Sequence, residues 1–176
     1  MNTDIKINDT TLKAIKDDIT NLDIESFVFY ARTDLKLGSG YGNAISTRGG
    51  PKIKEELDKI GSIEKTEAVV SAAGMLKAKY IIHAAGPMFS EENTESKLHN
   101  TMINALKEAQ KKGIKKVAFP LMGIGFYGIP PTQSLSIMTD AIKDYVKGND
   151  AFEEIIICAN DNREYLELEK IFKSLN

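Results

Sequence analysis

Short apolar blocks, several alternating with polar residues, are the first regular feature of the chain. Their lengths and their content of β-branched and aromatic residues are typical of strands. A polar turn at 8–10 separates the first two blocks, and the block at 154–159 is apolar without interruption. An unbroken apolar block predicts a strand that is buried on both faces. The predicted strands are 4–7, 11–16, 26–31, 68–71, 79–84, 116–120 and 154–159.

A second pattern, with apolar residues three or four positions apart, predicts helices between these strands. In 94–112, for example, Leu98, Met102 and Leu106 fall on one face, and Gly113 marks the end. Pro51 occupies a position favoured at the first turn of a helix that Gly61 ends. The predicted helices are 51–60, 94–112, 131–147 and 163–175.

The alternation of strands and helices predicts an α/β fold: a three-layer α/β/α sandwich with a mixed central sheet. No internal repeat or linker-like stretch interrupts it, so residues 1–176 are expected to form a single domain. Ligands of such sheets bind beyond the carboxyl ends of the strands. The loops that follow strands are therefore the first places to look for a site.

Composition narrows the function classes. The 23 basic and 25 acidic side chains give a net charge of -2, which argues against nucleic-acid binding through bulk positive charge. One cysteine and two distant histidines predict neither a disulfide nor a metal site. No apolar run reaches the roughly 18 residues of a membrane span, and the first six residues lack a signal-peptide pattern. We expect a cytoplasmic protein with no membrane partner and no cofactor.

The first candidate loop follows the strand at 26–31 and contains glycines at 38, 40 and 42. Alternate glycines allow a sharp turn in which successive backbone N–H groups point the same way, and a helix N-terminus after them favours a bound anion. A flexible connector explains the same composition equally well, and the pattern alone leaves both interpretations open.

The second candidate loop carries the letters G-x-G-x-x-G at Gly123, Gly125 and Gly128. This motif is typical of dinucleotide-binding loops. However, prolines at 120 and 130–131 bracket the loop, and no acidic residue ends a strand about 20 residues later, as contact with a cofactor ribose requires. A phosphate-binding loop is expected here, without hydride-transfer chemistry.

Taken in order, several motifs resemble the macro domain family of ADP-ribose-binding modules. Asp18-Ile19-Thr20 is similar to the family's Asp-Ile-Thr, and residues 40–45 to its first phosphate loop and following helix. The stretch 76–87, which ends Ile-His-Ala-Ala-Gly-Pro, is the most specific match. Residues 118–120 and 125–130 look like the second phosphate loop.

The resemblance implies that the chain binds ADP-ribose, free or on an ADP-ribosylated protein. Two glycine-rich loops would hold the diphosphate, Asp18 would accept a hydrogen bond from the adenine amine, Phe126 or Tyr127 would pack on the distal ribose, and Asn160 would lie near the base. The ligand-binding residues predicted in this way are Asp18, Ile19, Arg32, Gly38, Ser39, Gly40, Tyr41, Gly42, Met122, Gly123, Ile124, Gly125, Phe126, Tyr127 and Asn160.

The chain departs from the family pattern at the positions that serve hydrolysis. Phe29-Tyr30-Ala31-Arg32 stands where the family has Asn-Ala-Ala-Asn, Gly42 replaces an Asp, and Gly123-Ile124 replaces Ser-Thr. No matching general base is present, so we predict no catalytic residues. The alternatives are a hydrolase that removes ester, O-acetyl or terminal phosphate groups from ADP-ribose derivatives, and a degenerate scaffold for a protein or RNA partner.

Three further residues have competing interpretations. Arg32 either contacts a phosphate or ribose hydroxyl or forms a surface ion pair with Asp34. His83, at the end of an apolar strand, is more often a hydrogen-bonded structural residue than a catalyst. Cys158 lies within an apolar strand and is expected to be a buried, inert thiol. The sequence does not predict the oligomeric state.

Overall fold

The structure of the protein is a computed structural model that describes residues 4–176, so residues 1–3 of the predicted domain lie outside it. Residues 4–176 form a seven-stranded sheet with five α-helices and two short 3-10 turns. The strands are β1 (Ile5–Ile7), β2 (Thr10–Lys16), β3 (Ser26–Tyr30), β4 (Ala68–Ala72), β5 (Tyr80–Ala84), β6 (Lys116–Pro120) and β7 (Glu154–Ala159). The helices and turns are η1 (Ile19–Asn21), α1 (Tyr41–Gly49), α2 (Pro51–Ile60), α3 (Thr94–Lys111), η2 (Gly125–Tyr127), α4 (Pro131–Val146) and α5 (Asn162–Leu175).

The sheet is mixed, as the sequence predicts. Its strand order is β1-β2-β7-β6-β3-β5-β4. The five central strands are parallel to their neighbours, whereas β1 pairs with β2 and β4 pairs with β5 in the antiparallel direction. Parallel strands have their carboxyl ends at one edge of the sheet, so the loops after β3 and β6, which are neighbours in the sheet, come close together.

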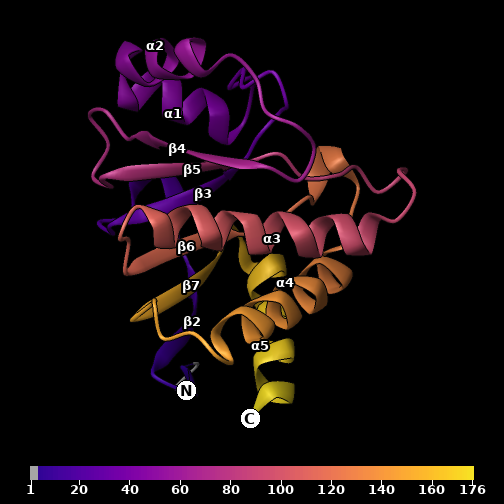
Figure 1. Ribbon diagram of the computed structural model, residues 1–176. Helices are drawn as coiled ribbons and strands as arrows, with labels where there is room; N and C mark the ends of the chain where they lie inside the picture. Colours follow the sequence, from indigo (N-terminus) through magenta and orange to yellow (C-terminus); the bar gives the residue numbers. More distant parts are fainter. Residues whose placement is uncertain (1–3) are drawn as a thin grey trace.

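Helices cover both faces of this sheet, which confirms the three-layer sandwich (Figure 1). Helices α1 and α2 pack on one face through Ile45, Ile53 and Leu57. Helices α3, α4 and α5 pack on the other face, where Leu98 and Leu106 belong to the larger of the two apolar cores. No helix within residues 4–176 has the length and apolar character needed to cross a membrane.

Strand β7 is buried as its unbroken apolar sequence predicts. Ile155 and Ile157 face the larger core, and Ile156 and Cys158 face the smaller one. The Cys158 thiol donates to the Asp17 carbonyl oxygen at 3.3 Å, and burial raises its pKa to about 12. The thiol is therefore protonated at neutral pH, which agrees with the predicted inert role.

Of the five α-helices in residues 4–176, α1 is the one that apolar periodicity does not predict. Its sequence, Tyr-Gly-Asn-Ala-Ile-Ser-Thr-Arg-Gly, contains weak helix formers and a single large aliphatic residue, Ile45. Ile45 is completely buried against the sheet. Tertiary packing thus stabilises a helix that local propensity does not favour.

Candidate functional site

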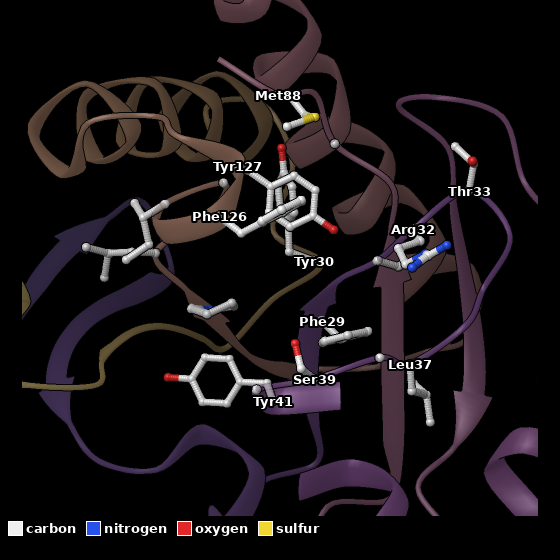
Figure 2. A pocket seen from close by; sticks show the side chains of 18 of the residues that line it. Phe29, Tyr30, Arg32, Thr33, Leu37, Ser39, Tyr41, Met88, Phe126 and Tyr127 are labelled. Atoms are coloured by element: carbon white, nitrogen blue, oxygen red, sulfur yellow. The ribbon is translucent and has the colours of Figure 1, made fainter. Parts of the chain in front are cut away.

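A cavity of about 650 Å³ opens at the carboxyl ends of β3 and β6. The two glycine-rich loops form two of its walls, and the segment that follows β5 contributes Gly86 and Met88 (Figure 2). Its place agrees with the general position of ligand sites in open α/β sheets. The predicted site residues that line it are Arg32, Gly38, Ser39, Gly40, Tyr41, Gly123, Ile124, Phe126 and Tyr127.

The first loop brings the N-terminus of α1 to the cavity. Helix α1 begins at Tyr41, and its N-cap residue, Gly40, has no side chain that could accept from the first N–H groups. Gly42 N–H donates to the Ser39 carbonyl oxygen and Ala44 N–H donates to the Gly40 carbonyl oxygen, both at 3.2 Å, whereas no acceptor within residues 4–176 is found for the N–H groups of Tyr41 and Asn43. Unpaired N–H groups and the positive end of the helix dipole favour an anion at this position.

The second loop is held in a tight conformation by its own backbone. Ile129 N–H donates to the Gly123 carbonyl oxygen at 2.9 Å, and Gly128 N–H donates to Gly125 at the same distance. Gly123 has a φ of 74°, and a Cβ there would lie 2.5 Å from the Ile129 side chain. Glycine is required at 123 for both reasons. The 3-10 turn η2 lies inside this loop, and α4 begins at Pro131, the second of the two prolines.

An aromatic cluster of Tyr30, Phe126 and Tyr127 forms the wall beside the second loop (Figure 2). The ring centroids of Tyr30 and Tyr127 are 4.5 Å apart, and those of Phe126 and Tyr127 are 5.5 Å apart, both in edge-on contact. Phe126 is 85% exposed, so its ring is open to a ligand. Burial raises the pKa of both tyrosines, so their hydroxyls remain protonated.

Tyr30 is a lining residue that sequence analysis did not single out. Its ring reaches from the end of β3 to the segment after β5, where its hydroxyl donates to the Pro87 carbonyl oxygen. A Cβ on Gly86 would lie 2.3 Å from the same hydroxyl. The glycine therefore makes room for the tyrosine, and the hydrogen bond links two walls of the cavity.

A Tyr30→Phe variant is expected to lose about 1–2 kcal/mol of unfolding free energy, because the buried Pro87 carbonyl would have no donor. Urea unfolding monitored by circular dichroism measures this loss. Tyr165→Phe, on α5 outside the cavity, is the matched control and should change stability by less than about 0.5 kcal/mol. Equal stability losses in the two variants would contradict the assigned hydrogen bond.

Arg32 lines the cavity and also forms the ion pair that the sequence left open. Its Nε and Nη2 donate to the two carboxylate oxygens of Asp34 at 3.1 and 2.8 Å. The hydrogen bonds from Arg32, followed by one from the Lys36 backbone N–H, lower the pKa of Asp34. Asp34 is the carboxylate residue among those lining the cavity in the described part of the chain. An ionised carboxylate already bonded to a guanidinium is a weak proton acceptor, so the pair is ill suited to general-base catalysis.

Lys65 is a second cation at the cavity that sequence analysis did not find. It lies in the segment between α2 and β4, and its Nζ is 3.1 Å from a carboxylate oxygen of Glu91. Glu91 also accepts from Met88 N–H at 2.6 Å and from Lys97 at 3.3 Å. The Met88 bond, together with those from the lysines, lowers the pKa of Glu91. This carboxylate fixes the cavity wall that carries Met88.

Asp18 lies outside the residues that line the cavity, and its carboxylate is already hydrogen-bonded. One oxygen accepts from Thr20 N–H at 3.0 Å and from the Thr20 hydroxyl at 2.6 Å, and the other accepts from Arg48 at 2.9 Å. Partial burial opposes ionisation, but the bonds from Thr20 and Arg48 outweigh it and lower the pKa of Asp18. The carboxylate is ionised and partly exposed, so it can still accept a further hydrogen bond.

Arg48 belongs to no sequence motif, but the bounds of α1 show which face of the helix it lies on. Tyr41, Ile45 and Arg48 are spaced four and three residues apart and share one face of the helix. Tyr41 lies close enough to Asp18 for the two to interact electrostatically, and burial raises the pKa of its hydroxyl. The helix therefore connects the cavity at Tyr41 to the Asp18 carboxylate.

The other predicted residues lie around the cavity rather than on its wall. Ile19 and Met122 are core residues with 1% and 0% exposure. Asn160 is exposed, and its backbone N–H donates to Glu164 at 2.6 Å. Gly42 is buried in the first turn of α1, and Gly125 begins η2. The structure does not bring their side chains to the cavity.

His83 lies outside the residues that line the cavity, although its strand ends near it. Its ring is completely buried, Nε2 is 2.8 Å from the Ser71 hydroxyl, and Nδ1 has no partner among residues 4–176. Burial lowers its pKa to about 3. The ring is neutral and structural, as predicted, with half of its hydrogen-bonding capacity unused. No group of three or more His, Cys, Asp or Glu in the described chain is placed to hold a metal ion.

Comparison with known proteins identifies the family of this chain. The model of the Macro domain family matches residues 30–138, from the end of β3 through the second loop into α4. The chain belongs to the macro domain family. An O-acetyl-ADP-ribose deacetylase 2 of Pantoea vagans is 33% identical to it over 88% of this chain and 94% of the relative. A longer Thermotoga maritima protein is 35% identical over 92% of this macro domain, which spans 28% of that protein.

The fold of this macro domain also matches solved structures closely. A structure described as the Oceanobacillus iheyensis macrodomain with ADP superimposes with a TM-score of 0.92. The match has 25% sequence identity and covers 98% of this chain and 95% of the other. This agreement confirms the family resemblance drawn from the motifs and the three-layer fold that it implied.

Proposed function

We propose that this macro domain, as one unit spanning residues 1–176, binds ADP-ribose, either free or attached to a protein, in the cavity between the two glycine-rich loops. The observation that carries the proposal is the unfilled helix N-terminus at Tyr41, which meets the second loop across one cavity. A chain with a net charge of -2 can bind a diphosphate with such backbone N–H groups and without a cluster of lysines. The relatives named for ADP and O-acetyl-ADP-ribose support the same ligand class.

The rest of the ligand follows from the residues at either end of the cavity. The exposed ring of Phe126, in contact with Tyr127, offers an apolar face to a ribose. At the other end, Tyr41 lies near the Asp18 carboxylate, which can accept a hydrogen bond from an exocyclic amine of the base. Arg32, at the start of the first loop, and Lys65, between α2 and β4, also line the cavity. Their charges favour a ligand with more than one negative group.

Calorimetric titration with ADP-ribose, with AMP and NAD as comparison ligands, tests the proposal. We expect micromolar binding of ADP-ribose and weaker binding of AMP, which lacks the second phosphate and the distal ribose. Asp18→Ala should weaken ADP-ribose at least about tenfold, because a hydrogen bond to a charged group is lost. Asp58→Ala is the matched control, since Asp58 forms an exposed ion pair with Lys54 on α2 and should leave the affinity unchanged.

Two results would contradict the proposal. The absence of heat for all three ligands at millimolar concentration would leave the chain as a scaffold for a protein or RNA partner. Equal affinities for ADP-ribose and AMP would mean that the second loop and the aromatic cluster do not contribute to binding. A peptide carrying ADP-ribose, titrated in the same way, would test whether the ligand is recognised on protein.

Hydrolysis of O-acetyl-ADP-ribose is the second candidate, and the similarity to the Pantoea vagans deacetylase favours it. Asp34 is held in its ion pair, and His83 is buried away from the cavity, so neither is placed as a general base. We therefore expect no release of acetate above that of a Gly125→Glu control. Turnover of the natural chain well above this control would establish an enzyme and overturn a purely binding role.

A further inference from the structure

The strand β4 forms one edge of the sheet (Figure 1), and none of its residues lines the cavity. It pairs with β5 on one side only, and the other side of its backbone faces outward. Sheet edges attract additional strands unless side chains or helices cover them. The hydrogen bonds along β4 therefore show whether this edge is covered.

The register of β4 and β5 determines which backbone groups point outward. Ala73 N–H donates to the Lys79 carbonyl oxygen, and Ala85 N–H donates to that of Glu67. Because hydrogen-bonded pairs alternate along an antiparallel ladder, Val69 and Ser71 also bond to β5. Ala68, Val70 and Ala72 consequently direct their N–H and carbonyl groups away from the sheet.

Side chains cover this edge at its two ends but not in its middle. At one end, Glu56 of α2 accepts from Ala72 N–H at 3.1 Å. At the other end, Asn104 of α3 donates to the Thr66 carbonyl oxygen at 2.8 Å. Between them, no hydrogen-bond partner within residues 4–176 is found for the N–H and carbonyl groups of Ala68 and Val70. Four backbone groups on two alternate residues of this edge are therefore without a partner in the described chain, and Val70 is the more exposed of the two residues, because Ala68 is 8% exposed.

A groove of about 330 Å³ lies over this open segment. Ile60, which ends α2 and is 39% exposed, forms its apolar side with Val69. The side near α3 carries Lys111, Lys112 and the single carboxylate of Glu108, which Lys111 already neutralises at 2.9 Å. Lys112 lies over the Tyr80 ring, 5.4 Å from its centroid, and no ion pair with a carboxylate is found for it within residues 4–176.

We propose that this groove binds an extended acidic segment of a partner protein, which adds to β4 as an eighth strand. The four open groups of Ala68 and Val70 supply the main-chain hydrogen bonds of such an addition. Alternate side chains of the added strand point to opposite faces, so acidic residues would face Lys111 and Lys112 while apolar ones would face Ile60. The segment therefore has an alternating acidic and apolar sequence.

A second copy of this chain is the less suitable occupant. Edge-to-edge pairing of two β4 strands would bring two sets of the same lysines to one interface, whereas the groove's carboxylate, Glu108, is already paired with Lys111. The covered ends at Glu56 and Asn104 also restrict pairing to a short window, which suits a peptide segment. The inference does not depend on the identity of the ligand in the cavity.

The test is a titration of the labelled chain with the peptide acetyl-Glu-Val-Glu-Val-Glu-Val-Glu-amide, followed by amide NMR. We expect chemical-shift changes centred on Ala68 and Val70, slowed hydrogen exchange at these two amides, and weaker binding at high salt. The matched peptide with lysine in place of glutamate should bind at least about tenfold more weakly.

Two variants distinguish strand addition from non-specific peptide binding. Val70→Pro removes an outward N–H without breaking the ladder to β5, which is the position where an edge strand tolerates proline. It should weaken the acidic peptide about tenfold through the lost hydrogen bond, and Lys111→Glu with Lys112→Glu should do the same through charge. The response to ADP-ribose of all variants should equal that of the natural chain, which also shows that they are folded.

The proposal is overturned if the acidic and basic peptides bind equally, or if neither perturbs Ala68 and Val70 at millimolar concentration. It is also overturned if sedimentation shows a dimer that Val70→Pro dissociates, because the edge would then belong to a second copy. Should the proline variant unfold, the double lysine variant decides the result alone, since Lys111 and Lys112 are exposed and their side-chain interactions found within residues 4–176 are those with Glu108 and Tyr80.

Discussion

A Gly42→Ala variant is expected to lose about 1–3 kcal/mol of unfolding free energy and at least about tenfold in ADP-ribose affinity. A Cβ on Gly42 would lie 1.7 Å from the Leu37 carbonyl oxygen and 2.4 Å from the Leu37 carbonyl carbon. Both are backbone atoms, so no side-chain rotation relieves the overlap. The first loop has to move away from the start of α1, and the N–H groups proposed to bind phosphate move with it.

Urea unfolding and calorimetry on the same preparations measure both effects. Gly148→Ala is the matched control, because a Cβ at Gly148 would meet nothing within 4 Å and the position is remote from the cavity. This control should stay within about 0.5 kcal/mol of the natural chain and bind ADP-ribose normally. A Gly42→Ala protein with normal stability and affinity would show that the loop does not need its close approach to Leu37.

The close approach of Gly42 to Leu37 is a tertiary contact, and the sequence predicts such contacts less well than it predicts strands and helices. Apolar periodicity is a local property, and it predicted all the strands and four of the helices of the sandwich with small errors at their ends. It missed α1, because a helix that is stabilised by one buried isoleucine leaves almost no periodic signal. The motif resemblance supplied what periodicity lacked, namely a helix after the first glycine-rich loop.

The candidate site was predictable where backbone conformation determines it. Closely spaced glycines predict loops whose backbone can approach a ligand. In the structure, both loops line one cavity. Tyr30, Lys65 and Arg48 were not found, because their roles depend on long-range contacts with Pro87, Glu91 and Asp18. No spacing rule along the chain encodes such contacts.

The role of Arg32 also depends on contacts that the sequence does not predict. The sequence offered a ligand contact and an ion pair with Asp34 as alternatives, and the structure has the ion pair at the cavity wall. The two are compatible, because an exposed ion pair contributes little to stability and its guanidinium keeps other donors free. Only the position of Arg32 relative to the loops, which is a tertiary property, brings it to the site.

His83 adds a pH dependence that the composition of the chain does not suggest. Its ring lies on the α2 side of the sheet in edge-on contact with Phe29, whose side chain lines the cavity. Within residues 4–176, Ser71 is the one polar side chain hydrogen-bonded to the ring, and no carboxylate there compensates for a charge on it. Burial therefore holds the folded pKa at about 3, against an unfolded value of about 6.5.

The sign of the effect follows from proton binding. Between pH 6.5 and pH 3 the unfolded chain binds a proton at His83 and the folded chain does not, so stability falls as the pH falls. The full contribution is present above pH 6.5 and decreases by up to about 1.4 kcal/mol per pH unit below it. Between pH 7.5 and pH 5 the loss amounts to about 2 kcal/mol, before most carboxylates begin to titrate.

A His83→Gln variant is expected to be less stable than the natural chain at pH 7.5, and the difference should shrink by about 2 kcal/mol at pH 5. Urea unfolding at both pH values measures the difference, and NMR of the His83 ring should show no protonation of the folded state down to pH 5. A constant difference, or a ring that titrates near pH 6, would mean that the imidazole has access to water. In that case the sheet beneath Phe29 would open in the folded state, and the floor of the cavity would be less rigid than its packing indicates.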